Sequence, residues 1–259
     1  MKSTSLKDAR GLLHSLELGT AIILALAVVA ALAGCAGAHF PPAAAASASQ
    51  PAQPVAATAP PPSVVFLGDS ITFLWGEPSF SPAFALHPAW TDAGEIGDDS
   101  GQIADRFAAQ VVAAVPRPRA VAILAGTNDV YPWWELCGGE HNWDTCQQLQ
   151  YMVGQAQANG VVPILATIPP WGCADAHCAL AAKADSSPER YARIDQLNAW
   201  IQAYGAAHGL VVVDYHSALV AADEETYAPA DTIDGVHPSA AGYALMTPLV
   251  EAAIAEATR

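Results

Sequence analysis

Positive charge is scarce in this sequence. Lys and Arg together number 10 against 25 Asp and Glu, so the 259 residues carry a formal net charge of −15 at pH 7. Nucleic-acid binding depends on cations that neutralise phosphates, and docking on anionic lipid depends on a basic patch. So acidic a chain is expected to do neither. Apolar residues are not scarce: they make up 53% of the chain, against 14% charged, which predicts one sizeable core rather than disorder.

A hydrophobic run long enough for a spanning helix is lacking near the N-terminus. The uncharged apolar run from Leu18 to Ala33 has 16 residues, whereas a spanning helix needs about 20. Lys2, Lys7 and Arg10 precede it. A short apolar run after a positive start is typical of a signal peptide, which we predict for residues 1–34.

The end of this run, Leu32-Ala33-Gly34-Cys35, resembles the lipobox of bacterial lipoproteins. The resemblance implies that Cys35 is lipidated and that the chain is exported and anchored to a bacterial membrane, facing the periplasm or the cell exterior. An ordinary cleaved signal peptide and an uncleaved N-terminal helix are the alternatives. Residues 35–62 are rich in Ala and Pro, which predicts an extended tether. The folded domain is therefore expected at residues 63–259.

Four further cysteines lie in that domain: Cys137, Cys146, Cys173 and Cys178. An even number in an exported chain indicates two disulfides. Of the three possible pairings, proximity favours Cys137 with Cys146 and Cys173 with Cys178. The alternative is a zinc site that includes His141 and His177. An oxidising compartment and the absence of a C-x2-C spacing argue against it, so no metal is expected.

Short apolar runs alternate with helical stretches through the domain. Strands are predicted at 64–67, 120–125, 161–167 and 210–214, with a short one near 90–94. Helices are predicted at 102–115, 144–158 and 187–207, and from 239 to the C-terminus. Buried strands separated by helices indicate a parallel sheet covered on both faces. In such sheets, functional side chains collect at the carboxyl ends of the strands.

A nucleophile and its base are suggested by two such loops. Ser70 follows the first strand within Gly68-Asp69-Ser70-Ile71-Thr72. A serine hydroxyl is a poor nucleophile until a base takes its proton. His237 is the candidate base, and Asp234, three residues before it, can orient the imidazole. Thr72 excludes the Gly-x-Ser-x-Gly elbow of the α/β-hydrolases.

Attack on an acyl carbon also needs donors for the oxyanion. Asn128 follows the 120–125 strand and can offer its side-chain amide. Gly97 follows the short strand and can offer a backbone N–H, with Gly94 as a nearby rival. The N–H of Ser70 would be the third donor. Asp69 and Asp129 are interpreted as structural carboxylates that bind loop backbone.

Four blocks together carry a family resemblance: Gly68-Asp69-Ser70-Ile71, Gly97, Gly126-Thr127-Asn128-Asp129 and Asp234-Gly235-Val236-His237-Pro238. In this order they resemble the SGNH, or GDSL-type, hydrolases. The resemblance implies a three-layer α/β/α sandwich with a parallel, flavodoxin-like sheet, and no metal or organic cofactor. It also implies Ser70 as nucleophile, His237 as base, Asp234 as orienting acid, and an oxyanion hole of Ser70, Gly97 and Asn128.

The second block departs from the family's usual Asn-Arg-Gly-Ile-x-Gly-Asp, because this chain has Asp92-Ala93-Gly94-Glu95-Ile96-Gly97-Asp98. The acidic Glu95, Asp98 and Asp99 beside Gly97 disfavour an anionic substrate.

Four tryptophans fall in predicted strand-end loops: Trp75, Trp133, Trp134 and Trp171. They are expected either to wall a substrate pocket or to plug the loops onto the core. The leading hypothesis is an ester hydrolase for short acyl groups, such as acetyl on a carbohydrate, acting through an acyl-serine. A lipid esterase, lysophospholipase or thioesterase, an O-acyltransferase and a non-catalytic envelope lipoprotein are the alternatives.

Overall fold

The computed structural model describes residues 61–131, 134–139, 144–175, 178 and 187–259. The predicted signal peptide, Cys35 and nearly all of the predicted tether lie outside these residues, as do Trp133, His141 and His177. Within the described residues, no helix is both long and apolar enough to cross a membrane.

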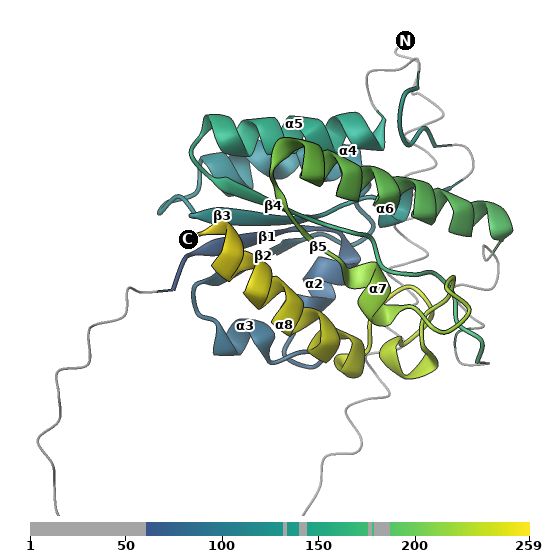
Figure 1. Ribbon diagram of the computed structural model, residues 1–259. Coiled ribbons are helices and arrows are strands. Elements are labelled where there is room, and N and C mark those ends of the chain that lie inside the picture. Colours follow the sequence, from purple (N-terminus) through teal and green to yellow (C-terminus); the bar gives the residue numbers. More distant parts are fainter. Residues whose placement is uncertain (1–60, 132–133, 140–143, 176–177, 179–186) are drawn as a thin grey trace, which may run out of the picture.

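A five-stranded parallel sheet forms the centre of the domain (Figure 1). Its order is β2-β1-β3-β4-β5. The strands are β1 Val64–Gly68, β2 Trp90–Gly94, β3 Ala120–Leu124, β4 Val162–Ala166 and β5 Val211–Val213. Every residue of β1 and β3 is buried, as expected for parallel strands covered on both faces. The predicted strands, including the short one at 90–94, are confirmed.

Helices cover both faces of the sheet, which makes the fold a three-layer α/β/α sandwich as predicted (Figure 1). One face carries α4 (Ser100–Phe107), α5 (Thr145–Ala158) and α6 (Pro188–His208). The other carries α2 (Ser70–Gly76), α3 (Ala83–Leu86), α7 (Tyr215–Leu219) and α8 (Ala240–Ala257). Shorter helical turns are η1 Ala108–Val112, η2 Thr127–Asp129 and η4 Pro229–Asp231.

Helix starts follow local capping chemistry. The side chain of Asp144 accepts from the N–H of Gln147 at the start of α5, and Ser187 accepts from the N–H of Arg190 at the start of α6. Such caps satisfy N–H groups that have no partner inside the helix. The predicted helix at 102–115 differs in detail, because α4 ends at Phe107 and continues as the π-helical turn η1.

Two disulfides join the predicted cysteine pairs, Cys137–Cys146 and Cys173–Cys178. The first ties the segment 134–139 to the first turn of α5, where the N–H of Cys146 also donates to the carbonyl of Leu136 at 2.8 Å. No group of three or more potential metal ligands occurs among the described residues.

Trp75 does not wall a pocket, contrary to one of the two expectations. Its side chain is buried in the layer between the sheet and α8, stacked on Tyr243 with ring centroids 5.7 Å apart and edge-on to Phe66 at 5.5 Å. Trp75 shares one face of α2 with Ile71 and Leu74, also buried. Leu74 and Trp75 lie three and four positions after Ile71, which is the spacing of one apolar helix face, so α2 turns this indole into the core.

Candidate active site

Ser70 lies where β1 turns directly into α2. The side chain of Asp69 caps the helix, with Oδ1 accepting from the N–H of Ile71 at 2.9 Å. Gly68 permits the close approach of the turn, since a Cβ there would lie 2.2 Å from Thr72 Oγ1 and 2.8 Å from the carbonyl of Leu124. The tight strand-to-helix turn therefore leaves Ser70 at the carboxyl edge of the sheet.

Ser70, His237 and Asp234 form a continuous chain of two hydrogen bonds, called the relay below. Ser70 Oγ is 2.9 Å from His237 Nε2, and His237 Nδ1 is 2.8 Å from Asp234 Oδ2. With its proton on Nδ1, the imidazole donates to Asp234 and accepts from the Ser70 hydroxyl. These are the distances that a nucleophile, its base and an orienting carboxylate require.

The loop that carries this pair is held by its own side chains. Asp234 Oδ1 accepts from the N–H of Val236 at 2.9 Å and from that of His237 at 2.8 Å. Thr232 Oγ1 donates to the carbonyl of His237 at 2.8 Å. Because Oδ1 serves the loop backbone, Asp234 Oδ2 is left to hold the imidazole.

The charges around His237 favour its protonated form. Burial lowers the pKa of His237, but the charge of Asp234, the hydrogen bond to it and the charge of Asp69 together outweigh burial, so the net shift is upward from 6.5. Burial likewise raises the pKa of Asp234, and the charge and hydrogen bonds of His237 reverse that shift to a net lowering. Both directions describe a carboxylate that stabilises an imidazolium.

Two oxyanion-donor candidates lie in the loops after β2 and β3, the strands on either side of β1. Gly97 is the third residue of a turn that the N–H of Asp98 closes onto the carbonyl of Glu95 at 3.4 Å, and its φ of 82° requires glycine. Asn128 Nδ2 donates to the carbonyl of Asp98 at 2.9 Å. An amide carries two N–H bonds, so one remains for another acceptor.

Gly94 is used differently from Gly97. Its N–H donates to Asp92 Oδ1 at 2.8 Å, and a Cβ on it would lie 2.1 Å from the backbone nitrogen of Phe73. Gly94 is therefore a close contact between β2 and α2, and Gly97 is the donor candidate that the turn presents.

The two carboxylates interpreted as structural do bind loop backbone. Burial raises the pKa of Asp69 to about 6, and this rise outweighs the lowering of the pKa by the hydrogen bond from the N–H of Ile71. Asp129 accepts from the N–H of Ser100 at 3.0 Å, from the Ser100 hydroxyl and from Thr145 Oγ1 at 2.8 Å. It thus joins the starts of α4 and α5 to the loop after β3. Burial raises the pKa of Asp129 to about 7.

A family model described as the GDSL-like lipase/acylhydrolase family matches residues 66–245. The chain belongs to this family. The match spans all four blocks and the full relay, and the chain is accordingly a GDSL-type ester hydrolase. Among curated protein sequences, nothing matches it.

Solved structures agree with this membership. A Bacteroides fragilis NCTC 9343 protein assigned as an acylhydrolase shares 32% identity over 76% of this chain and 88% of that one, with a TM-score of 0.62. A GDSL-like lipase from Bacteroides thetaiotaomicron VPI-5482 shares 31% over 75% and 88%, also at 0.62. The lipase/acylhydrolase of Enterococcus faecalis shares 26% over 74% and 93%, at 0.53.

The remaining tryptophans of this GDSL-type hydrolase divide between burial and partial exposure. Trp171 is buried against the guanidinium of Arg190, whose carbon lies 4.1 Å above the ring and 4.0 Å above the ring of Tyr131. Trp134 is half-buried, and its carbonyl accepts from Arg193. Trp171 therefore packs the loop after β4 and does not present a free ring face.

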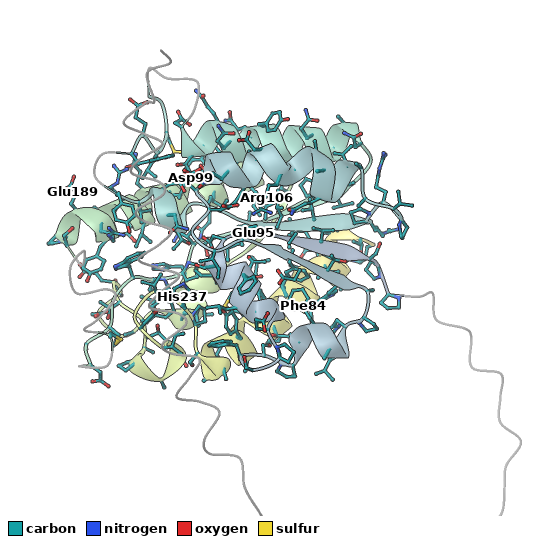
Figure 2. All side chains as sticks on the ribbon, turned by 180° about the vertical axis from the view of Figure 1, so that it is seen from behind. Phe84, Glu95, Asp99, Arg106, Glu189 and His237 are labelled. Carbon is teal, nitrogen blue, oxygen red and sulfur yellow. A yellow bond between two sulfur atoms is a disulfide. The ribbon has the colours of Figure 1, made fainter. Side chains whose placement is uncertain are left out.

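Two arginines that the sequence analysis did not single out organise this edge of the GDSL-type fold. Arg190 is the buried cation between Trp171 and Tyr131, and Arg106, on α4, binds Asp98. Figure 2 labels Arg106, Glu95 and Asp99 in one region of the molecule. The only sequence feature that pointed to these two arginines was the rarity of Lys and Arg, which number 10 among 259 residues.

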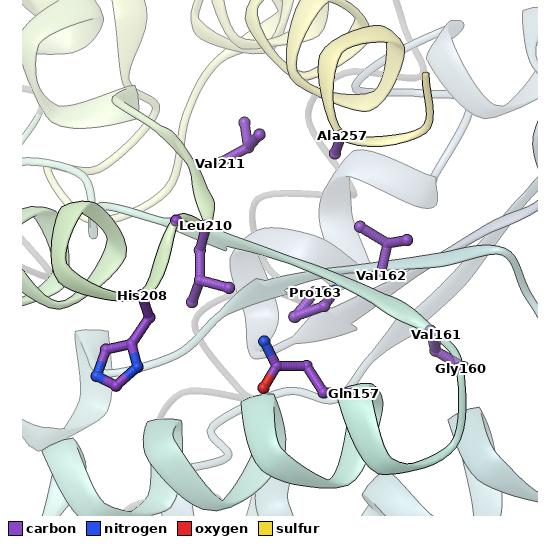
Figure 3. A pocket seen from close by; sticks show the side chains of 10 residues that line it. Gln157, Gly160, Val161, Val162, Pro163, His208, Leu210, Val211 and Ala257 are labelled. Carbon is purple, nitrogen blue, oxygen red and sulfur yellow. The ribbon is translucent and has the colours of Figure 1, made fainter.

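An open hollow of about 380 Å³ lies at the opposite edge of the sheet (Figure 3). It is lined by the starts of β4 and β5 and the ends of α5 and α6, including Gln157, Val162, His208 and Val211. Neither Ser70 nor His237 borders it. The candidate active site of this hydrolase is therefore identified from Ser70, His237 and Asp234, and this hollow is not part of it.

Proposed function

We propose that the protein hydrolyses carboxylic esters through an acyl intermediate on Ser70. The observation that carries the proposal is the relay of 2.9 Å from Ser70 Oγ to His237 Nε2 and 2.8 Å from His237 Nδ1 to Asp234 Oδ2. Each residue then has a defined task. His237 takes the proton of Ser70, and Asp234 holds the imidazole in the correct tautomer and stabilises the imidazolium.

Attack of Ser70 Oγ on the ester carbon forms a tetrahedral oxyanion. The N–H groups of Ser70 and Gly97 and the free N–H of Asn128 stabilise it. His237 returns its proton to the leaving alkoxide, which departs as an alcohol. Water, deprotonated by His237, then attacks the acyl-serine and releases the acid.

We propose that the substrate is an ester of a short, uncharged acyl group, such as an acetyl ester on a carbohydrate. The acidic Glu95 and Asp99 adjoin the Gly97 turn and oppose an anionic group there through repulsion, whereas Asp98 is paired with Arg106. Trp75 and Trp171 are packed into the protein, so neither indole supplies an apolar wall for a fatty acyl chain.

Export and lipid anchoring at Cys35 are also part of this proposal. The apolar run that ends in Leu32-Ala33-Gly34-Cys35 supports them. So do the two disulfides, because disulfides persist in oxidising compartments. Globomycin, which blocks lipoprotein signal cleavage, should leave a larger precursor of the wild type, and Cys35→Ser should escape this effect.

The catalytic proposal is tested with p-nitrophenyl acetate, butyrate and octanoate. Ser70→Ala and His237→Ala should lower kcat by about 10⁶-fold, and Asp234→Asn by about 10⁴-fold. Asparagine keeps Oδ1 for the loop backbone and loses only the acceptor for Nδ1. The matched control is Asp223→Asn, in an exposed turn where the carboxylate accepts from the N–H groups of Glu225 and Thr226.

Full activity of folded Ser70→Ala would disprove the acyl-serine. Acetate turned over faster than octanoate is the expected order, and the reverse order would indicate a lipid esterase. A product that carries the acyl group on an added sugar, in place of free acid, would identify an acyltransferase.

A further inference from the structure

Arg106 contacts the ends of two of the three strands that lead into the candidate oxyanion hole. Its Nη2 donates to the carbonyl of Gly68 at 3.0 Å, two residues before Ser70. Its Nη1 donates to the carbonyl of Ala93 at 3.0 Å, four residues before Gly97. One guanidinium therefore joins the carboxyl ends of β1 and β2.

The same side chain also holds the turn that contains Gly97. Arg106 Nε donates to Asp98 Oδ2 at 2.8 Å, and the two side chains are only 19% and 16% exposed. The carbonyl of Asp98 in turn accepts from Asn128 Nδ2. The third donor is thus tied to Arg106 through a single residue.

Helix α4 is anchored at both ends around this cluster. At its start, the N–H of Ser100 donates to Asp129 Oδ2 at 3.0 Å, and Asp129 neighbours Asn128. At its last turn, Arg106 reaches the strand ends. The helix therefore connects the loops of all three oxyanion donors, at one end through a carboxylate and at the other through a guanidinium.

We propose that Arg106 is a positioning residue for the oxyanion hole, which sets the geometry of Ser70 N–H, Gly97 N–H and the Asn128 amide relative to one another. This inference rests on the proposed function. Guanidinium suits the task because its planar set of donors can bind several acceptors in fixed directions, whereas an ammonium cannot. Donors misplaced by a fraction of an ångström lose much of their effect on a transition state.

The test compares Arg106→Ala and Arg106→Lys with wild type in the full-length chain, using p-nitrophenyl acetate. Removing one oxyanion donor costs about 10²–10³-fold in kcat, so a disturbed hole should lower kcat by at least about tenfold. KM should stay within about twofold, because the oxyanion exists only in the transition state. Millimolar guanidinium chloride should restore part of the kcat of Arg106→Ala.

Arg117→Ala is the matched control. Arg117 also donates to two carbonyls, those of Val112 at 3.1 Å and Asn159 at 3.2 Å, but it is exposed and outside the cluster. Its kcat should equal that of wild type. Should Arg106→Ala fail to fold, Arg106→Lys carries the test, because a lysine keeps the charge and loses the three-way geometry.

Crystal structures of the variants separate this inference from the proposed function. If wild type lacks Ser70-dependent turnover, the proposed function fails, and displacement of Gly97 and Asn128 in the Arg106 variants still supports the positioning role. Unmoved donors would overturn that role. So would a folded Arg106→Ala with unchanged kcat, or one whose loss of kcat equals its unfolded fraction.

Discussion

At the scale of single residues, the site depends on one imidazole in a buried setting. His237 is 1% exposed and lies between the Ser70 hydroxyl and the Asp234 carboxylate. Burial alone would lower its pKa, yet Asp234 and Asp69 give a net rise above 6.5. The residue that must accept a proton is therefore protonated more readily than a free histidine.

The acid limb of the activity profile should report this rise. A base must be neutral to accept the Ser70 proton, so kcat/KM should increase with pH and reach half its plateau above pH 6.5. In Asp69→Asn, which removes one negative charge near His237, the limb should move to lower pH. Rates of p-nitrophenyl acetate hydrolysis between about pH 5 and 9 measure both. A flat profile in wild type would contradict a histidine base.

At the scale of elements, the two disulfides differ in what they support. Cys137–Cys146 joins the segment 134–139 to α5. Gly172, next to Cys173 of the second disulfide, instead contacts the loop of His237, because its N–H donates to the carbonyl of Gly235 at 2.6 Å. Tyr227 strengthens this contact through its hydroxyl, which donates to the carbonyl of Val236 at 3.0 Å.

Replacing each pair by serines should therefore separate stability from activity. Either double variant should lose about 2–3 kcal/mol of unfolding free energy, since each bond closes a short loop. Cys173→Ser/Cys178→Ser should also lower kcat, because the His237 loop loses support, whereas Cys137→Ser/Cys146→Ser should change kcat less. Urea unfolding and ester hydrolysis measure the two effects. Equal kcat in both variants would contradict the role assigned to this contact in supporting the His237 loop.

At the scale of the whole molecule, buried acids oppose stability as pH rises. The pKa values of Asp69 and Asp129 are raised by burial to about 6 and about 7, from 3.8. Between about pH 4 and 7 the native state keeps protons that the unfolded chain has lost. The unfolded state then binds fewer protons, and stability falls as pH increases. The net charge of −15 adds self-repulsion in the same direction.

The free energy of unfolding should therefore be lower at pH 8 than at pH 5, by about 2 kcal/mol or more, since a pKa difference of one corresponds to about 1.4 kcal/mol. Urea titrations at both values measure it. Asp69→Asn keeps an oxygen for the N–H of Ile71 and removes one titrating group, so its dependence on pH should be weaker. Stability that rises from pH 5 to pH 8 would contradict the assignment.

The fold class, the strand positions and the relay of Ser70, Asp234 and His237 could all be predicted from the order of the amino acids. These were predictable because short apolar strands and the polar residues directly after them are local features. In a parallel sheet the carboxyl ends of all strands meet at one edge, which accounts for the position of Ser70 directly after β1. His237 instead precedes α8, 167 positions from Ser70, and it was predicted from its motif. Cysteine proximity also predicted both disulfides.

The directions of the side chains and the contacts that join separate loops became known from the three-dimensional structure. It turned Trp75 into the core, placed Trp171 on Arg190, used Gly94 as a contact between elements, and brought Arg106 to two strand ends. None of these has a local signal, because each depends on packing between segments distant in the sequence. The catalytic side chains of the site therefore lie in short sequence motifs. Their exact positions depend on three-dimensional contacts with residues outside those motifs.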